Sequence, residues 1–100
     1  MERIDHIALP VADISAALDW YREHFTCETL YVDESWALLG FENISLALVL
    51  PDQHPPHFAV TRADAESHGT VTPHRDGTAS VYTRDPWNNA IEIMKSDARA

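Results

Sequence analysis

The sequence predicts an α+β fold in which two βαβββ modules form a curved mixed sheet. Two observations lead to this prediction: an internal repeat relates the two halves of the chain, and each half shows the same succession of strand and helix patterns. We expect one domain over residues 1–100, with a first module at about 1–51 and a second at about 56–96. One hundred residues are enough for one hydrophobic core and too few for two.

The internal repeat is local but free of gaps. The segment DHIALPVAD at residues 5–13 aligns on PHFAVTRAD at residues 56–64, with the histidine, two alanines and the final aspartate identical. The proline-rich segment at residues 51–57 lies between the two copies and indicates a linker, because proline has no N–H to donate to a sheet. Such a repeat predicts two copies of one supersecondary unit.

The first module is expected to begin with a strand at Ile4–Leu9. Asp13 then stands where a helix N-cap belongs, since a carboxylate there accepts from the free N–H groups of the first turn. Apolar residues follow at helical spacing and predict a buried stripe: Ile14, Ala17, Leu18, Tyr21 and Phe25. Three short strands are expected after the helix: Glu28–Val32, Trp36–Phe41 and Ile44–Leu50.

The second module repeats this order with a short helix. His57–Thr61 is expected as a strand, and Asp64–His68 allows at most a turn or two of helix before Gly69. A strand near Val71 is a further expectation. The last two strands are expected at Thr78–Thr83 and Ala90–Met94, joined by a hairpin at Asp85–Asn89 whose Asp, Pro and Asn residues are typical of turns.

The short second helix predicts an incompletely covered sheet, and therefore a homodimer. Four apolar side chains of the second module are expected on the sheet face that points away from the cleft, where little helix is available to cover them: Phe58, Val60, Ile91 and Ile93. A two-fold related partner is the commonest cover for such a patch. In the alternative, the loop at Ala63–Pro73 folds over the patch and the chain stays monomeric.

Composition excludes several classes of protein. Seven basic and sixteen acidic residues give a net charge of −9, which disfavours nucleic acid and anionic membranes as partners. No apolar run has membrane-spanning length, and the first residues do not resemble a secretion signal. Cys27 has no partner for an internal disulfide, so we expect a reducing, cytoplasmic location.

Three residues on the expected strands form a candidate metal site. Because side chains alternate along a strand, His6 and His57 occupy equivalent faces, and Glu92 lies opposite the bulky residues of the last strand. Two imidazoles and one carboxylate form a ligand set suited to an octahedral divalent metal, above all Fe(II). His54, three residues before His57, is an alternative ligand.

The repeat also predicts a missing fourth ligand. Aligning residues 46–49 on residues 91–94 places Ala47 opposite Glu92, and alanine cannot bind a metal. Three protein ligands leave coordination positions open.

Two further residues are expected beside the metal cleft. If the last hairpin is centred near Trp87, Tyr82 lies directly opposite Glu92, where a phenol can donate or accept a proton. The alternative is that Tyr82 is a packed strand aromatic. His74 is a candidate at the cleft rim, whereas His24 and His68 are expected on the surface.

The segments at residues 5–13 and 85–92 resemble the opening and closing signatures of the glyoxalase / bleomycin-resistance / extradiol-dioxygenase superfamily, also called vicinal oxygen chelate proteins. The resemblance implies paired βαβββ modules around a metal, often completed by dimerisation, with His6, His57 and Glu92 on the metal-ligand positions. Residues 72–74, 81–82, 85–86 and 92 are similar to the extradiol ring-cleavage signature, in which the positions matching His74 and Tyr82 act beside the metal.

The resemblance implies a metal-dependent protein that acts on a small oxygen-bearing substrate. Extradiol-type ring cleavage is its most specific form; isomerase, epimerase or thiol-transfer chemistry is also in keeping with it. Fe(II) or Mn(II) is the favoured metal, and Zn(II) or Ni(II) is possible. The rival hypothesis is a metal-free protein that sequesters a ligand, as bleomycin-resistance proteins do.

Overall fold

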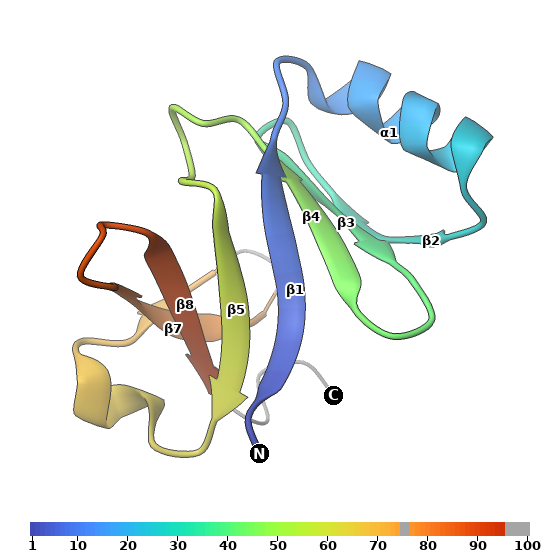
Figure 1. Ribbon diagram of the computed structural model, residues 1–100. Helices are drawn as coiled ribbons and strands as arrows, with labels where there is room; N and C mark the ends of the chain where they lie inside the picture. The colour runs from blue at the N-terminus through green and yellow to red at the C-terminus, as the bar shows by residue number, and fades with distance from the viewer. Residues whose placement is uncertain (75–76, 96–100) are drawn as a thin grey trace. The chain divides into compact units, whose positions relative to one another are not determined.

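The computed structural model describes residues 1–74 and 77–95, so the expected module and domain ends at residues 96 and 100 lie outside the described part. Within it the chain forms eight strands, one α-helix and one 3₁₀ helix (Figure 1). It divides into two compact units. The first unit is His6–Pro56; the second unit is Met1–Asp5 together with the chain from His57 onward.

The first unit has the predicted order of elements. Strand β1 (Arg3–Pro10) enters it at His6 and is followed by helix α1 and three strands. The bounds are α1 Ile14–His24, β2 Glu28–Val32, β3 Trp36–Gly40 and β4 Ser45–Val49. Neighbouring strands lie in the order β2-β3-β4-β1. Because β1 runs parallel to β4 while the other pairs are antiparallel, this sheet is mixed, as expected.

Helix α1 starts and stops where its local chemistry dictates. The Asp13 carboxylate accepts a hydrogen bond from the Ala16 N–H at 3.0 Å, which confirms the predicted N-cap. At the other end Phe25 is extended, and its N–H still donates to the Tyr21 carbonyl, closing the last turn. The helix is therefore fixed by side-chain capping at one end and by a change of backbone conformation at the other.

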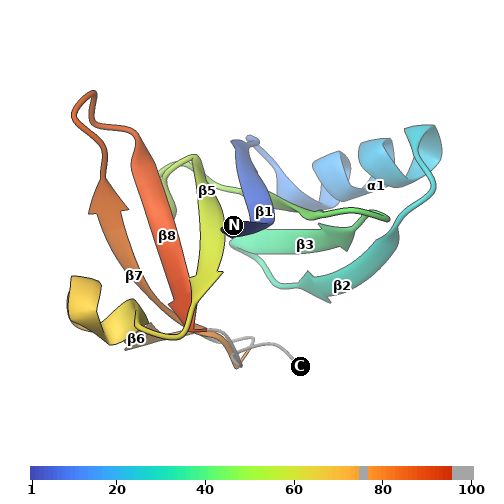
Figure 2. The same ribbon diagram turned by 60° about the horizontal axis from the view of Figure 1, so that its bottom comes forward.

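The sheet of the first unit has apolar side chains on both faces. On one face α1 contributes Ile14, Ala17, Leu18 and Tyr21 to a core with three fully buried strand residues, Ala37, Leu39 and Leu48. Figure 2 shows α1 along that face. On the other face Ala8, Leu38, Ala47 and Val49 form a second buried cluster against Tyr31 and Trp36. Alternation along the strands separates the two clusters.

The second unit repeats the strand order with little helix. Its elements are β5 His57–Arg62, the 3₁₀ helix η1 Ala65–His68, β6 Thr72–Pro73, β7 Ala79–Arg84 and β8 Ala90–Lys95. The order is β5-β8-β7-β6, with β5 parallel to β8 and the other pairs antiparallel (Figure 2). The short second helix is confirmed, and the strand expected near Val71 is the two-residue β6.

The loop after β5 covers part of the sheet of the second unit. The helix η1 contacts β7 and β8, and Ala65 on it is fully buried. Gly69 follows at φ +150°, where a Cβ atom would stand 3.1 Å from Val81 Cγ1. Ile93, on the strand β8 that η1 contacts, is 6% exposed, in keeping with the alternative in which the loop at Ala63–Pro73 folds over the patch; Val60 and Ile91 are half-buried, and Phe58 stays 38% exposed.

In the part of the chain that the structure describes, no helix combines the length and the hydropathy that a membrane-spanning segment needs.

The N-cap leads to a stability prediction. Asp13→Ala removes the acceptor of the Ala16 N–H, so the free energy of unfolding should fall by about 1 kcal/mol, measured by urea denaturation. Asp19→Ala is the matched control, because Asp19 is exposed within α1 and its replacement removes the same charge without touching a cap. Equal losses in the two variants would show that charge, not capping, is what Asp13 contributes.

Candidate metal centre

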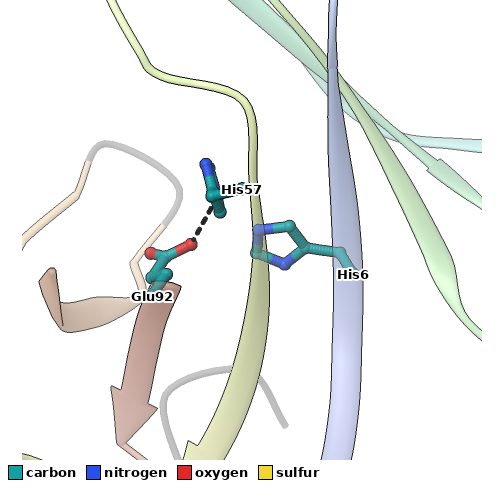
Figure 3. A group of neighbouring side chains, drawn as sticks. All are labelled: His6, His57 and Glu92. Atoms are coloured by element: carbon teal, nitrogen blue, oxygen red, sulfur yellow. Dashed lines mark hydrogen bonds and ion pairs between the residues drawn. The ribbon is translucent and has the colours of Figure 1, made fainter. Parts of the chain in front are cut away.

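His57 and Glu92 form the buried polar pair at the centre of the second unit. They lie on the parallel neighbours β5 and β8, where Ala59 pairs with Glu92 and His57 with Ala90. The offset of two residues places both side chains on one face, with His57 Nε2 at 3.0 Å from Glu92 Oε1 (Figure 3). His57 is 9% exposed and Glu92 4%, so each needs a polar partner inside the protein.

The second carboxylate oxygen of Glu92 has partners of its own. The Ser80 hydroxyl on β7 donates to Glu92 Oε2 at 2.6 Å, and Ser80 is 1% exposed. His74 Nε2 lies 2.6 Å from Ser80 Oγ and 3.4 Å from Glu92 Oε2. The His74 backbone is held in turn by its N–H, which donates to the Thr78 carbonyl at 2.7 Å. Four side chains from four segments (β5, β8, β7 and the turn after β6) thus form one connected chain: His57, Glu92, Ser80 and His74.

Tyr82 stands across from Glu92, as the hairpin predicted. The antiparallel register of β7 and β8 pairs the two residues directly. The Tyr82 ring meets the His57 ring edge-on, with centroids 5.2 Å apart and an interplanar angle of 88°. Desolvation, and after it the negative charge of Glu92, raise the pKa of the Tyr82 phenol. At neutral pH the phenol therefore keeps its proton and can donate a hydrogen bond.

His6 occupies the equivalent place in the first unit. It lies on β1, on the same face as Ala8, and is 4% exposed. The residue before it, Asp5, belongs to the second unit together with His57 and Glu92. Within the described ranges, one group of His, Cys, Asp and Glu side chains could hold a metal ion, and it consists of His6, His57 and Glu92 (Figure 3).

The other histidines lie elsewhere. His54, the alternative ligand, is in the turn after β4 with its ring 6.4 Å from that of Trp36, and it is not part of the group. His24 stacks on Trp20 at 4.0 Å, and His68 lies 3.7 Å from Asp64; both are exposed, as expected. The structure therefore brings His74 and Tyr82, but not these three, to the His57–Glu92 pair.

Ser80 is the site residue that sequence reasoning missed. The signal was available: if Tyr82 faces Glu92, then Ser80, two positions earlier on the same strand, must share that face. A serine in a strand carries no chemical signature by itself, whereas His, Glu and Tyr do. Only its burial between a carboxylate and an imidazole shows its importance.

The strand register confirms that Ala47 occupies the position in the first unit that Glu92 occupies in the second. In the first unit β1 pairs with β4 so that Ala8 lies opposite Ala47, as Ala59 lies opposite Glu92 in the second unit. Ala47 is 2% exposed and belongs to the apolar cluster with Ala8, Leu38 and Val49. Leu38 pairs with Ala47 where Tyr82 pairs with Glu92. The first unit has apolar packing at both positions where the second unit has polar chemistry.

The chemistry of the donor set suits a hard or borderline divalent metal. Two imidazole nitrogens and one carboxylate oxygen are the ligands of the facial-triad type, which leaves positions open on an octahedral ion. Glu92, satisfied by Ser80 on one oxygen, has its other oxygen directed at an imidazole that can also bind metal. A carboxylate that binds a metal ion is usually oriented by a hydrogen bond to its other oxygen, as Ser80 provides here.

Comparisons with known proteins agree on one family. The family model described as "Glyoxalase/Bleomycin resistance protein/Dioxygenase superfamily" matches residues 3–93. A superfamily member from Vibrio splendidus shares 12% identity at a TM-score of 0.69, covering 95% of this chain and 98% of its own. Methylmalonyl-CoA epimerase from Mycobacterium tuberculosis shares 18% identity at a TM-score of 0.73, covering 93% and 87%. At these identities the likeness is one of fold. No curated protein sequence matches the chain.

The register relationship leads to a prediction for Ala47. In Ala47→Glu the introduced carboxylate stands to His6 as Glu92 stands to His57, so affinity for Ni(II) or Zn(II) should rise, measured by competition with a chromophoric chelator. Without metal the variant should be less stable than the wild type, because a carboxylate is then buried among Ala8, Leu38 and Val49.

Ala47→Gln is the control for the Ala47 prediction, since it adds the same bulk without a charged ligand. Metal affinity that is equal in the two variants would contradict the proposed equivalence of Ala47 and Glu92.

Proposed function

Because the chain belongs to the glyoxalase/bleomycin resistance protein/dioxygenase superfamily, we propose that it is a metalloenzyme with one divalent ion bound by His6, His57 and Glu92. The observation that carries this proposal is the buried His57–Glu92 pair, whose imidazole occupies the repeat position that His6 occupies in the first unit. Burying a histidine and a carboxylate together costs free energy even when they are hydrogen-bonded, and a binding site is a reason to retain such a pair.

His6 is the third ligand in this proposal for reasons internal to the chain. It is buried, it is on the strand face that holds Ala8 and Ala47, and it is one peptide bond from Asp5 of the second unit. The repeat adds that His6 and His57 begin equivalent stretches of strand. Its side chain adds the second imidazole to the donor set.

The ligand set favours Fe(II) or Mn(II), with Zn(II) or Ni(II) as alternatives. The bound ion would supply Lewis acidity that polarises the oxygens of a small substrate. Side chains next to the ion would then handle the protons of the reaction. Tyr82, whose phenol stays protonated, is proposed to donate a hydrogen bond to a developing oxyanion, and His74 to hold a proton at its Nε2 atom.

The reaction we propose is extradiol-type ring cleavage of a catechol, with dioxygen as the co-substrate and oxidant whose two atoms enter the cleaved product, supported by the motif that joins His74, Tyr82 and Glu92. A second candidate is an epimerisation or isomerisation, because a methylmalonyl-CoA epimerase has this fold and such a reaction needs a positioned acid and base beside a polarised oxygen. The rival is a metal-free protein that sequesters its ligand. A spectrophotometric screen of catechols and dicarbonyl compounds, with and without Fe(II), distinguishes ring cleavage, epimerisation or isomerisation, and ligand sequestration from one another.

We further propose a homodimer in a reducing cytoplasm. The lone Cys27 and the net charge of −9 are in keeping with that compartment. For the dimer, each unit leaves apolar strand residues in solvent: Phe58 is 38% exposed in the second unit, and Ile7 and Leu9 are 38% and 36% exposed in the first.

The metal site is tested by its content. His6→Ala, His57→Ala and Glu92→Gln should each reduce bound metal at least tenfold in protein purified without added metal, measured by inductively coupled plasma mass spectrometry. His24→Ala is the control, since His24 is exposed and stacked on Trp20. Stoichiometric metal in the His6 or Glu92 variant would refute the site, and metal retained in His57→Ala alone would point to His54.

The dimer is tested by sedimentation equilibrium. We expect twice the 11.3 kDa chain mass at micromolar concentration, because burial of an apolar side chain contributes about 1.5–3 kcal/mol. Phe58→Asp should shift the equilibrium towards monomer, whereas Val32→Asp, on the edge strand β2, should leave it unchanged. A mass equal to that of one chain across the concentration range would contradict the proposed dimer.

A further inference from the structure

The two oxygens of Glu92 are treated differently by the protein. Oε1 faces the His57 imidazole at 3.0 Å, whereas Oε2 accepts from the Ser80 hydroxyl at 2.6 Å. All of these residues lie in the second unit, so the arrangement is internal to one compact body. Glu92 and Ser80 are 4% and 1% exposed, which leaves little room for solvent to compete for either oxygen.

The proton count gives this chain of hydrogen bonds a direction. Ser80 has one hydroxyl hydrogen and two partners at 2.6 Å, the Glu92 carboxylate and His74 Nε2. An ionised carboxylate can only accept, so Ser80 donates to Glu92, and His74 must donate to the Ser80 oxygen. His74 is therefore protonated at Nε2. Its side chain, 24% exposed, anchors the buried serine from the outer side.

This direction restricts how Glu92 can bind a metal ion. For both carboxylate oxygens to bind, Oε2 would have to turn away from Ser80 and leave a buried hydroxyl without its acceptor, which is unfavourable. Binding through Oε1 alone leaves the hydrogen bond to Ser80 in place. The same bond also prevents rotation of the carboxylate about its terminal torsion.

We propose that Ser80, supported by His74, is a positioning residue that holds Glu92 as a one-oxygen ligand and so keeps three coordination positions of the ion open. The inference rests on the proposed metal site. A carboxylate that bound through both oxygens would leave two positions of an octahedral ion open, whereas one-oxygen binding leaves three, which is one more than a substrate with two neighbouring oxygens fills.

The test counts water molecules on bound Mn(II) through the relaxation rate of bulk water protons. An octahedral ion with three single-atom protein ligands has about three water ligands, and a two-oxygen Glu92 would reduce them to about two. We expect about three for the wild-type chain. In Ser80→Ala, where Oε2 is released, the proton relaxivity of the bound ion should fall by about one third.

Two matched variants complete the experiment. Ser80→Thr keeps a hydroxyl and should keep the wild-type relaxivity. Thr83→Val removes a hydroxyl from the opposite face of β7 and should also have no effect. A purely structural role for Ser80 would lower the free energy of unfolding in Ser80→Ala without changing the number of water ligands.

The outcomes separate this inference from the metal site itself. If the wild type shows about two water ligands, or if folded Ser80→Ala keeps about three, the positioning role is overturned while the site stands. If Mn(II) binds no more tightly to the wild type than to His57→Ala, the proposed site fails and this inference fails with it. Should Ser80→Ala not fold, the count for the wild-type chain decides.

Discussion

The burial of one carboxylate constrains the arrangement of the whole second unit. Glu92 is almost without solvent contact, and a carboxylate in such a place must be matched by donors on every side that the fold allows. His57 from β5 and Ser80 from β7 supply them, because β8 lies between these two strands. A register slip of one residue on either strand would turn a donor to the other face. Strand order and register are thus tied to the needs of one charged group.

The first unit shows what the same topology becomes without that group. Its parallel strand pair has the same offset, but Ala47 stands where Glu92 would be, and Leu38 stands where Tyr82 would be. Apolar packing fills the face instead, and a full helix covers the other one. In the second unit, which has the polar chain at its centre, η1 is the only helix among the described residues that contacts the sheet. The first unit has apolar clusters on both faces of its sheet, and the second has the hydrogen-bonded chain of His57, Glu92, Ser80 and His74.

Much of this could be predicted from sequence because the informative signals are local or periodic. The Asp13 cap, the strand bounds of β2, and the opposition of Tyr82 and Glu92 follow from capping chemistry, alternation and turn composition. Two things could not be predicted. Ser80 has no distinctive chemistry until its neighbours are known. The sequence also left open whether a partner or the loop at Ala63–Pro73 covers Ile93, because the path of that loop depends on tertiary packing rather than on propensity. The ligand role of His6 and the dimer stay predictions.

The division of the chain at Asp5 and His6 has a consequence for the order of folding. Five residues at the start of the chain belong with the part that begins at His57, and Glu2 lies 3.6 Å from Arg62. The contacts of residues 1–5 with the second unit therefore close a loop of about fifty intervening residues, His6–Pro56, and form only after these have been synthesised. The first unit, which is contiguous in sequence, has no such requirement. During synthesis it can fold first, and its folding shortens the effective loop that the second unit must close.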